Sequence, residues 1–510
     1  MRPPLAQAPA PHSLSSSGVM PFSPLLLLLF VTACQGVPLA PHNARARATA
    51  LKSVPREVRL RHAARMRKWA APQHLRSSPW APIFPTSYGA DPTGVADSTA
   101  AFGAALEALL ARNTSGHADE GGSVDLGGAI IDLQGGDYLI SSPLVFPSNY
   151  SNYGLIHGTL RASAAFPPSA NLLEVGTAGG YCSNWGDSCT EDVTLEDLLL
   201  DGAGVAGGGV RFNAVIGANA AHLFVVNFTA KGVVMEGGHE VLLSNSWVGA
   251  CWYTPPASCW LNASALKNTT GIWINGNDHY LDQVIVFAGT QGVVVDGAAN
   301  ILSGVHTWNT QSGSVPWAIG IAVNVWQNRL VGPYLDFVPL VLQGAALTTV
   351  TGAFFLGGAQ IIFKPHPDGY PVRGVYIAGS QFASSGDVPD VVSTRDPPGF
   401  SGLEDVTITG SLSDDPAMPR RSTVCTKTLV AAAPPWNFDF TDCLAFNASA
   451  PGTPIQSVSV AVSQSRVGGV GFVAMADPCQ GALVTVRPYL GAPAEATVTV
   501  TVDQSVRRGP

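Results

Sequence analysis

Short apolar runs recur through the middle of the chain and indicate a stack of similar units. Each run begins with Leu or Val, lasts a few residues and is followed by small or polar residues. Successive runs start about 20 to 40 residues apart, a spacing typical of repeat architectures. Their first residues are Leu195, Leu223, Leu242, Leu281, Leu302, Leu330 and Val350.

A second apolar run follows a glycine in the same repeats, starting at Gly232, Gly271, Gly292 and Gly320. Side chains alternate in a strand, so Val233 and Met235, with their counterparts in other repeats, are expected to face inward. Runs this short, separated by Gly and Asn turns and lacking a helical period, predict an all-β solenoid. Each coil of a solenoid buries its apolar face against its neighbours.

The first coil of such a stack needs a cover. An apolar stripe of Phe102, Leu106, Leu109 and Leu110 predicts a helix there, and Asp97 is a candidate N-cap. We expect the solenoid to occupy residues 85–415. Beyond it, alternating residues at 458–462 and 497–502 predict strands of a small β-domain over residues 421–510.

The N-terminus reads as a targeting region. An apolar core of roughly ten residues around Leu25–Val31 is too short to span a bilayer and resembles a secretory signal peptide. We assign residues 1–36 to this signal peptide and residues 37–84 to a basic linker or pro-segment. A lipid anchor at Cys34 and a retained membrane anchor are the alternatives. The chain is therefore expected to be secreted, extracellular or in a cell wall, with no stable membrane insertion after cleavage.

Charge is distributed unevenly. Residues 1–76 hold eleven Lys and Arg and one acid, Glu57. The whole chain has 27 Lys and Arg and 35 Asp and Glu, so the remainder carries 16 bases against 34 acids. A body this acidic argues against nucleic acid as a partner.

Cysteine spacing and glycosylation sequons agree with export. We expect local disulfides Cys182–Cys189 and Cys251–Cys259, because close pairs of this kind form in oxidising compartments. Cys425 and Cys443 make a third close set, and the partner of Cys479 is left open. Six Asn-x-Ser/Thr sequons predict a glycoprotein, at Asn113, Asn149, Asn227, Asn262, Asn268 and Asn447.

The segment Tyr88–Phe102 resembles the opening motif of the pectate-lyase-like β-helix superfamily. An ordered series of later segments resembles a narrower family, the QUARTET-type polygalacturonases. The series comprises Gly158–Ser163, Gly238–Glu240, Gly276–Asp278, Ala298–Asn309, Asn328–Val331, Tyr334–Asp336 and Phe354–Gly357. The resemblance implies a right-handed parallel β-helix and a hydrolase of α-1,4-galacturonan, the backbone of pectin, in the cell wall.

One departure from ordinary polygalacturonases concerns the catalytic carboxylates. Those enzymes carry Asn-Thr-Asp, Asp-Asp, Gly-His-Gly and Arg-Ile-Lys on successive coils. The matching places here are Thr229–Gly232, Asn268–Gly271 and Gly289–Gly292, and none of them holds a carboxylate. The acids of those enzymes therefore have no counterpart at these positions.

Outward polar groups on neighbouring coils offer a different site. With Leu302 and Leu330 in register, His306 lies beside Tyr334 and Trp308 beside Asp336. Coils are about 4.8 Å apart, so the side chains of His306 and Asp336 can converge on one sugar. We predict Asp336 and His306 as catalytic residues, and Trp308, Tyr334 and Asn309 as substrate contacts. A surface aromatic patch with a turn Asp is the alternative.

No cofactor is expected, although a column of Glu236, Asn275, Asp296 and Asn324 supplies stacked oxygens that could hold Ca²⁺. A solvated polar ladder is the alternative for that column. The expected partner is a polysaccharide. Besides hydrolysis, two functions remain open: a lyase or epimerase acting on uronates, and a non-catalytic carbohydrate-binding wall protein. A neutral glycan is an alternative substrate because the body is acidic.

Overall fold

The computed structural model describes residues 81–112, 123–177, 189–251, 268–309, 318–383, 392–393, 403–414, 421–431, 434–446, 448, 454–464, 473–490 and 496–505. The expected signal peptide and most of the basic segment lie outside the described residues. So do Cys182 and Cys259, and the sequons at Asn113, Asn262 and Asn447. No helix within the described ranges is long and apolar enough to cross a membrane.

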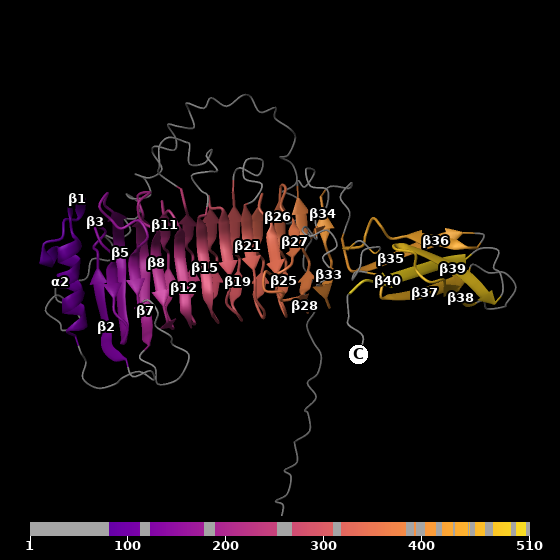
Figure 1. The fold of residues 1–510 in the computed structure, drawn as a ribbon, viewed down its shortest axis with the longest axis horizontal. Coiled ribbons are helices and arrows are strands. Elements are labelled where there is room, and N and C mark those ends of the chain that lie inside the picture. Colours follow the sequence, from indigo (N-terminus) through magenta and orange to yellow (C-terminus); the bar gives the residue numbers. More distant parts are fainter. Residues whose placement is uncertain are drawn as a thin grey trace, which may run out of the picture. The chain divides into compact units, whose positions relative to one another are not determined.

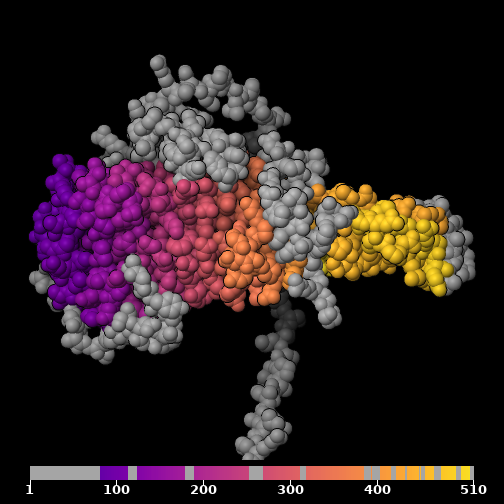
Figure 2. Space-filling model, viewed as in Figure 1, coloured from indigo at the N-terminus to yellow at the C-terminus, as the bar shows by residue number. Residues whose placement is uncertain are grey.

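The described chain forms an all-β, right-handed parallel β-helix, as the sequence predicts. A 32-stranded parallel sheet wraps into coils whose strands stack in chain order (Figure 1). The space-filling view shows the same succession along the molecule, from indigo to orange (Figure 2). Each regular coil contributes three short strands, which form three columns.

The first column contains β8 (Gly208–Asn213), β12 (Lys231–His239), β15 (Thr270–Asn277), β18 (Gln291–Val295), β21 (Ile319–Val323), β24 (Leu340–Gln343), β27 (Ile361–Lys364) and β31 (Val392–Ser393). The second contains β10 (Asn219–Ala221), β13 (Leu242–Ser244), β16 (Tyr280–Asp282), β19 (Ile301–Ser303), β22 (Arg329–Val331), β25 (Thr349–Thr351), β29 (Tyr376–Ala378) and β33 (Thr407–Thr409). The third contains β11 (Phe224–Val226), β14 (Trp247–Gly249), β17 (Ile285–Phe287), β20 (His306–Trp308), β23 (Tyr334–Asp336), β26 (Phe354–Leu356), β30 (Gln381–Ala383) and β34 (Leu412–Ser413).

Alternation sorts the first column as expected. Val233, Met235, Ile272 and Ile274 are fully buried in the hydrophobic core that runs through the coils. Of the residues between them, Val234 is buried but lies outside that core, and Trp273 is half-buried. A short pair, β28 (Val372–Arg373) and β32 (Leu403–Glu404), adds a small separate sheet.

Glycine is the second residue of β12, β15, β18 and β21 in the first column, and these glycines lie in register. A Cβ added to Gly232 would lie 2.8 Å from the carbonyl oxygen of Gly271, and one added to Gly271 would lie 2.7 Å from that of Gly292. Contacts this short do not occur for real Cβ atoms. Glycine recurs at this position because the backbone of the next coil occupies the space a side chain would need.

The first coils are built from longer strands and one helix. They contain η2 (Pro85–Tyr88), β1 (Thr93–Asp97), α2 (Thr99–Leu110), β2 (Val124–Asp132), β3 (Asp137–Ile140), β4 (Leu144–Phe146), β5 (Tyr150–Ala162), β6 (Asn171–Val175), β7 (Thr190–Asp201) and β9 (Val215–Ile216). α2 contacts η2, β2 and β4, and its Phe102, Ala105 and Leu109 join the solenoid core. The expected N-cap is off by one residue, because Ser98 is the N-cap. Asp97 instead accepts the Thr99 amide through Oδ1 at 3.0 Å.

The C-terminal part differs in being antiparallel. Its strands form two three-stranded sheets, β35–β40–β37 and β36–β39–β38. The bounds are β35 (Val424–Ala431), β36 (Trp436–Asp439), β37 (Ser457–Gln464), β38 (Val473–Ala476), β39 (Leu483–Leu490) and β40 (Ala496–Asp503). A second hydrophobic core, with Trp436, Phe440, Val498 and Val500, lies within it.

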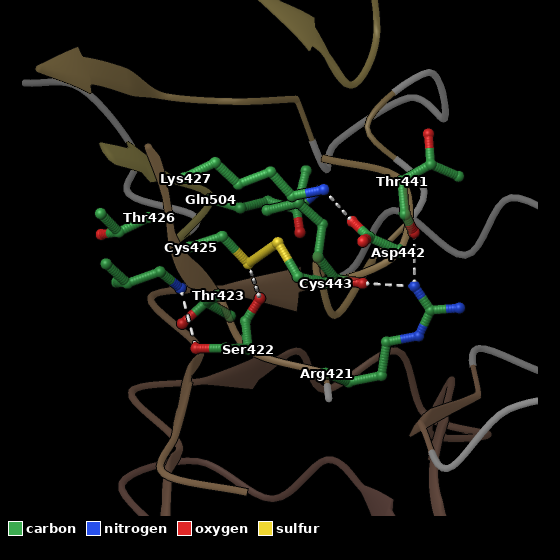
Figure 3. The surroundings of a disulfide bond; sticks show 12 residues. Arg421, Ser422, Thr423, Cys425, Thr426, Lys427, Thr441, Asp442, Cys443 and Gln504 are labelled. Carbon is green, nitrogen blue, oxygen red and sulfur yellow. Dashed lines mark hydrogen bonds and ion pairs between the residues drawn. A yellow bond between two sulfur atoms is a disulfide. The ribbon is translucent and has the colours of Figure 1, made fainter. Parts of the chain in front are cut away.

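A disulfide ties β35 to the segment after β36. Cys425 bonds to Cys443, with their Cα atoms 6.3 Å apart (Figure 3). Beside it, the Lys427 ammonium donates to Asp442 at 2.6 Å. Cys189 and Cys251 are each disulfide-bonded as well, but the residues predicted to pair with them lie outside the described chain. Cys479 is a free cysteine.

Candidate functional site

The predicted site lies on the outer face of the third column, on β20 and β23. The strands pair in parallel with His306 opposite Tyr334 and Trp308 opposite Asp336, which confirms the expected register. His306 Nε2 lies 3.9 Å from Asp336 Oδ2, on the diagonal between the strands. Their side chains are 26% and 19% exposed. Two side chains separated by 30 positions in the sequence therefore meet at one place.

Burial shifts the two pKa values in opposite directions. Partial burial raises the pKa of the Asp336 carboxyl and lowers the pKa of the His306 imidazole. Each shift favours the neutral form, because a low-dielectric surrounding disfavours charge. A carboxyl with a raised pKa next to an imidazole with a lowered pKa is a typical arrangement for proton transfer.

Both side chains also have a polar atom without a hydrogen-bond partner. His306 Nε2 and Asp336 Oδ1 are buried, and neither has a hydrogen-bond partner among the described residues. Buried polar atoms in native proteins are nearly always satisfied, so two orphaned atoms on adjacent strands require an explanation.

Aromatic rings surround this pair. The Tyr334 ring stacks on the His306 imidazole with centroids 4.0 Å apart, and its edge meets Phe354 at 5.0 Å. Trp308 stacks on Phe287 at 5.8 Å. Burial and the Asp336 carboxylate raise the pKa of Tyr334, so its hydroxyl stays protonated.

The sequence predicts Asn309 as a sugar contact, but the structure places this side chain differently. Asn309 is only 4% exposed, and its Nδ2 donates to the carbonyl oxygen of Gly289 at 3.1 Å. Its backbone amide donates to the Asp336 carbonyl oxygen at 3.3 Å. Asn309 therefore braces the turn after β20 and the backbone of Asp336. Asn309 directly follows the outward-facing Trp308, so alternation directs its side chain inward.

The predicted polar column on the first column of strands is present but already engaged. Asp296 accepts Trp273 Nε1 at 2.6 Å and Asn324 Nδ2 at 2.7 Å, one on each oxygen. Glu236 Oε2 accepts the Arg211 guanidinium at 2.5 and 3.0 Å. Ca²⁺ needs six or more oxygens free to converge on it. Carboxylates held by N–H donors do not provide that set, so the column does not fit Ca²⁺.

Sequence reasoning missed Arg211 and Trp273 in this column. Trp273 lies two residues before the predicted Asn275, and Arg211 lies on β8, in a coil that the predicted column did not include. Only the register of the coils brings Arg211 to Glu236 and Trp273 to Asp296.

A cluster elsewhere brings three ligand types together. Glu196, Asp197 and His222 each offer one atom, and these atoms lie within 4.8 Å of one another. His222 is exposed and the two acids are half-buried. Exposed acidic groups of this kind occur without a metal, and this cluster does not by itself define a metal site.

Several residues within the resemblance segments serve the fold. Asn300 and Asn328 are fully buried, and each offers its Oδ1 to a backbone amide of the preceding coil, at 2.8 and 2.9 Å. His279 is also buried, and burial lowers its pKa to about 3. Its Nδ1 accepts the Val241 amide at 3.1 Å. These side chains form an internal ladder that joins the turns of successive coils.

The sequence was compared with family models and with proteins of known function. No family model matches the sequence. Polygalacturonase QRT3 of Arabidopsis thaliana is 33% identical over 424 residues, which are 82% of this chain and 84% of that protein.

Solved structures with a related arrangement are more distant. ORF18 of Geobacillus virus E2 is 12% identical, with a TM-score of 0.49, and the match covers 81% of this chain and 77% of that one. The A-module of the mannuronan C-5 epimerase AlgE4 of Azotobacter vinelandii is 13% identical, with a TM-score of 0.41 and coverage of 65% and 95%. TM-scores below 0.5 carry no functional weight, so the assignment rests on the sequence relative. One third identity over more than four-fifths of both chains shows that this chain belongs to the family of polygalacturonase QRT3.

Proposed function

We propose that the chain hydrolyses a polyuronide, polygalacturonate in the first instance, outside the cell. The observation that carries this proposal is the 33% identity to polygalacturonase QRT3 along 424 residues. The parallel β-helix and the outward pair on β20 and β23 supply the surface and the chemistry.

Asp336 is the proton donor in this proposal. Its raised pKa keeps the carboxyl protonated at a pH where an ordinary Asp has ionised. It transfers that proton to the glycosidic oxygen as the bond to the sugar breaks. The Asp336 carboxylate then regains a proton from water. His306, 3.9 Å away and kept neutral by burial, adds no positive charge that would favour the ionised form of Asp336. Trp308 and Tyr334 contact the sugar with the ring surface that their neighbours leave exposed.

The separation of the pair limits its role. In inverting glycosidases the acid and the base lie about 6.5 to 9.5 Å apart on opposite faces of the sugar. His306 and Asp336 at 3.9 Å act from one face. They therefore assist the leaving group, and they do not include the group that activates water.

The same short distance favours one second candidate, β-elimination on a uronate. A neutral His306 can remove the proton next to the carboxylate of the sugar, while Asp336 protonates the leaving oxygen from the same face. The carbon–oxygen bond breaks and a carbon–carbon double bond forms. No water is consumed, so the products differ from those of hydrolysis.

Secretion belongs to the same proposal. The Cys425–Cys443 disulfide supports an oxidising compartment, since cytosolic proteins rarely keep such bonds. The short apolar N-terminal stretch supports the same destination. We propose the extracellular space or cell wall as the site of action.

The reaction is tested by its products. The purified secreted protein is incubated with polygalacturonate, and reducing ends and ultraviolet absorbance are followed together. New reducing ends without absorbance support hydrolysis. Absorbance that rises with the reducing ends identifies elimination. The absence of both signals contradicts action on this polymer.

A further inference from the structure

A second group of charged side chains lies on the outer face of the first column, on β12, β15 and β18. The Lys231 ammonium lies 3.2 Å from the centroid of the Trp273 ring. Trp273 is held in place from two sides, because its Nε1 donates to Asp296 and its ring packs against the cluster of Val294 and Ala322. The ring therefore fixes where the ammonium lies.

Two carboxylates flank Lys231, but both are bound to other donors. Glu236 pairs with the Arg211 guanidinium at 2.5 Å, and Asp296 accepts one N–H on each oxygen, from Trp273 and Asn324. Neither carboxylate forms an ion pair with Lys231 within the described chain. The Lys231 ammonium therefore has N–H donors that neither of these carboxylates accepts.

The surroundings of Lys231 disfavour its positive charge. Burial lowers the pKa of Lys231, Arg211 lowers it further, and Glu236 and Asp296 partly oppose the shift. A half-buried ammonium without an ion-pair partner is stabilised when an anion reaches it. An anionic ligand group therefore gains a charge-assisted hydrogen bond that no residue described here provides.

We propose that Lys231, positioned by Trp273 and bordered by Arg211 and Glu236, binds the carboxylate of an acidic sugar. This binding site is distinct from the pair His306 and Asp336, because it lies on the first column of strands and that pair lies on the third. The inference does not depend on hydrolysis, since a wall-binding protein without activity could use the same site.

The test compares one ligand in two charge states. Trigalacturonate and its fully methyl-esterified form are titrated calorimetrically into wild type, Lys231→Met, Lys231→Arg and Lys364→Met. The ligand is recovered afterwards to verify its length. Lys364 is the matched control, because it is a half-buried lysine on β27 of the same column. By the pairing of strands it lies five coils from Lys231, about 24 Å away.

Wild type and Lys364→Met are expected to bind the free acid about tenfold more tightly than the ester, which corresponds to about 1.4 kcal/mol. Lys231→Met is expected to lose this preference, and Lys231→Arg is expected to keep most of it. A preference retained in Lys231→Arg also shows that substitution at this position does not by itself unfold the site. Equal binding of acid and ester by wild type, or an unchanged preference in Lys231→Met, overturns the inference. If polygalacturonate is degraded while Lys231→Met keeps the preference, only this inference fails. If nothing is degraded while the preference depends on Lys231, only the proposed function fails.

Discussion

The glycine ladder of the first column gives a sharp test of the coil packing. In Gly271→Ala the new Cβ would lie 2.7 Å from the carbonyl oxygen of Gly292 and against the buried side chain of Val286. The first neighbour is backbone fixed in the parallel sheet, so it cannot move without breaking the register of β15 and β18. Overpacking of a rigid core costs about 1 to 3 kcal/mol, and we expect the upper end.

The matched control is Gly103→Ala in α2. Nothing lies within 4 Å of the added Cβ there, and the residue is exposed. Replacing glycine with alanine inside an exposed helix should stabilise the protein by about 0.5 to 1 kcal/mol. Chemical denaturation followed by tryptophan fluorescence compares the two variants with wild type. Opposite signs are predicted. A Gly271→Ala variant within about 0.5 kcal/mol of wild type would refute the close approach between coils.

Three further outcomes follow from the structure. Activity should fall as the pH rises through the raised pKa of Asp336, because the carboxyl then loses its proton. Activity should also fall at acidic pH, below the usual His pKa of about 6.5, where His306 takes up a proton. A profile of rate against pH checks both decreases. Because the pKa of Asp336 is raised, the free energy of unfolding should decline as the pH rises from about 4. Asp336→Asn should therefore unfold at a higher denaturant concentration than wild type at neutral pH. An equal or lower midpoint contradicts the pKa shift. Replacing Cys425 and Cys443 by Ser opens a loop with a sequence separation of 18 and should lower the free energy of unfolding by about 3 kcal/mol, whereas no change in calorimetry argues against the bond.

The sequence predicts the coil architecture well because each coil repeats the same physical constraints. Glycine is the second residue of β12, β15, β18 and β21 because the backbone of the next coil leaves no room for a side chain, and alternation buries Val233 and Met235. The pairing of His306 with Tyr334 follows from aligning apolar starts, since a slip of one residue would expose the core.

Details at the ends of strands could not be derived in this way. Asn309 directly follows the outward-facing Trp308, and its buried side-chain amide donates to the carbonyl oxygen of Gly289. Lys231 and Trp273 lie on neighbouring coils, on β12 and β15. Their contact depends on how the two side chains are oriented, which the sequence pattern does not specify. The carboxyl of Asp97 lies one residue before the N-cap, a distinction that propensity does not capture.

The most direct test of the account is the initial rate of Asp336→Asn on polygalacturonate, measured beside wild type and Asp201→Asn. Asp201 is the matched control because strand pairing places it in the same column and at the same position of its coil, five coils away. Loss of a general acid typically costs 10²- to 10⁴-fold in rate. We predict at least about a hundredfold loss for Asp336→Asn and a rate near wild type for Asp201→Asn. A wild-type rate in Asp336→Asn would contradict the assignment of this carboxyl as the proton donor.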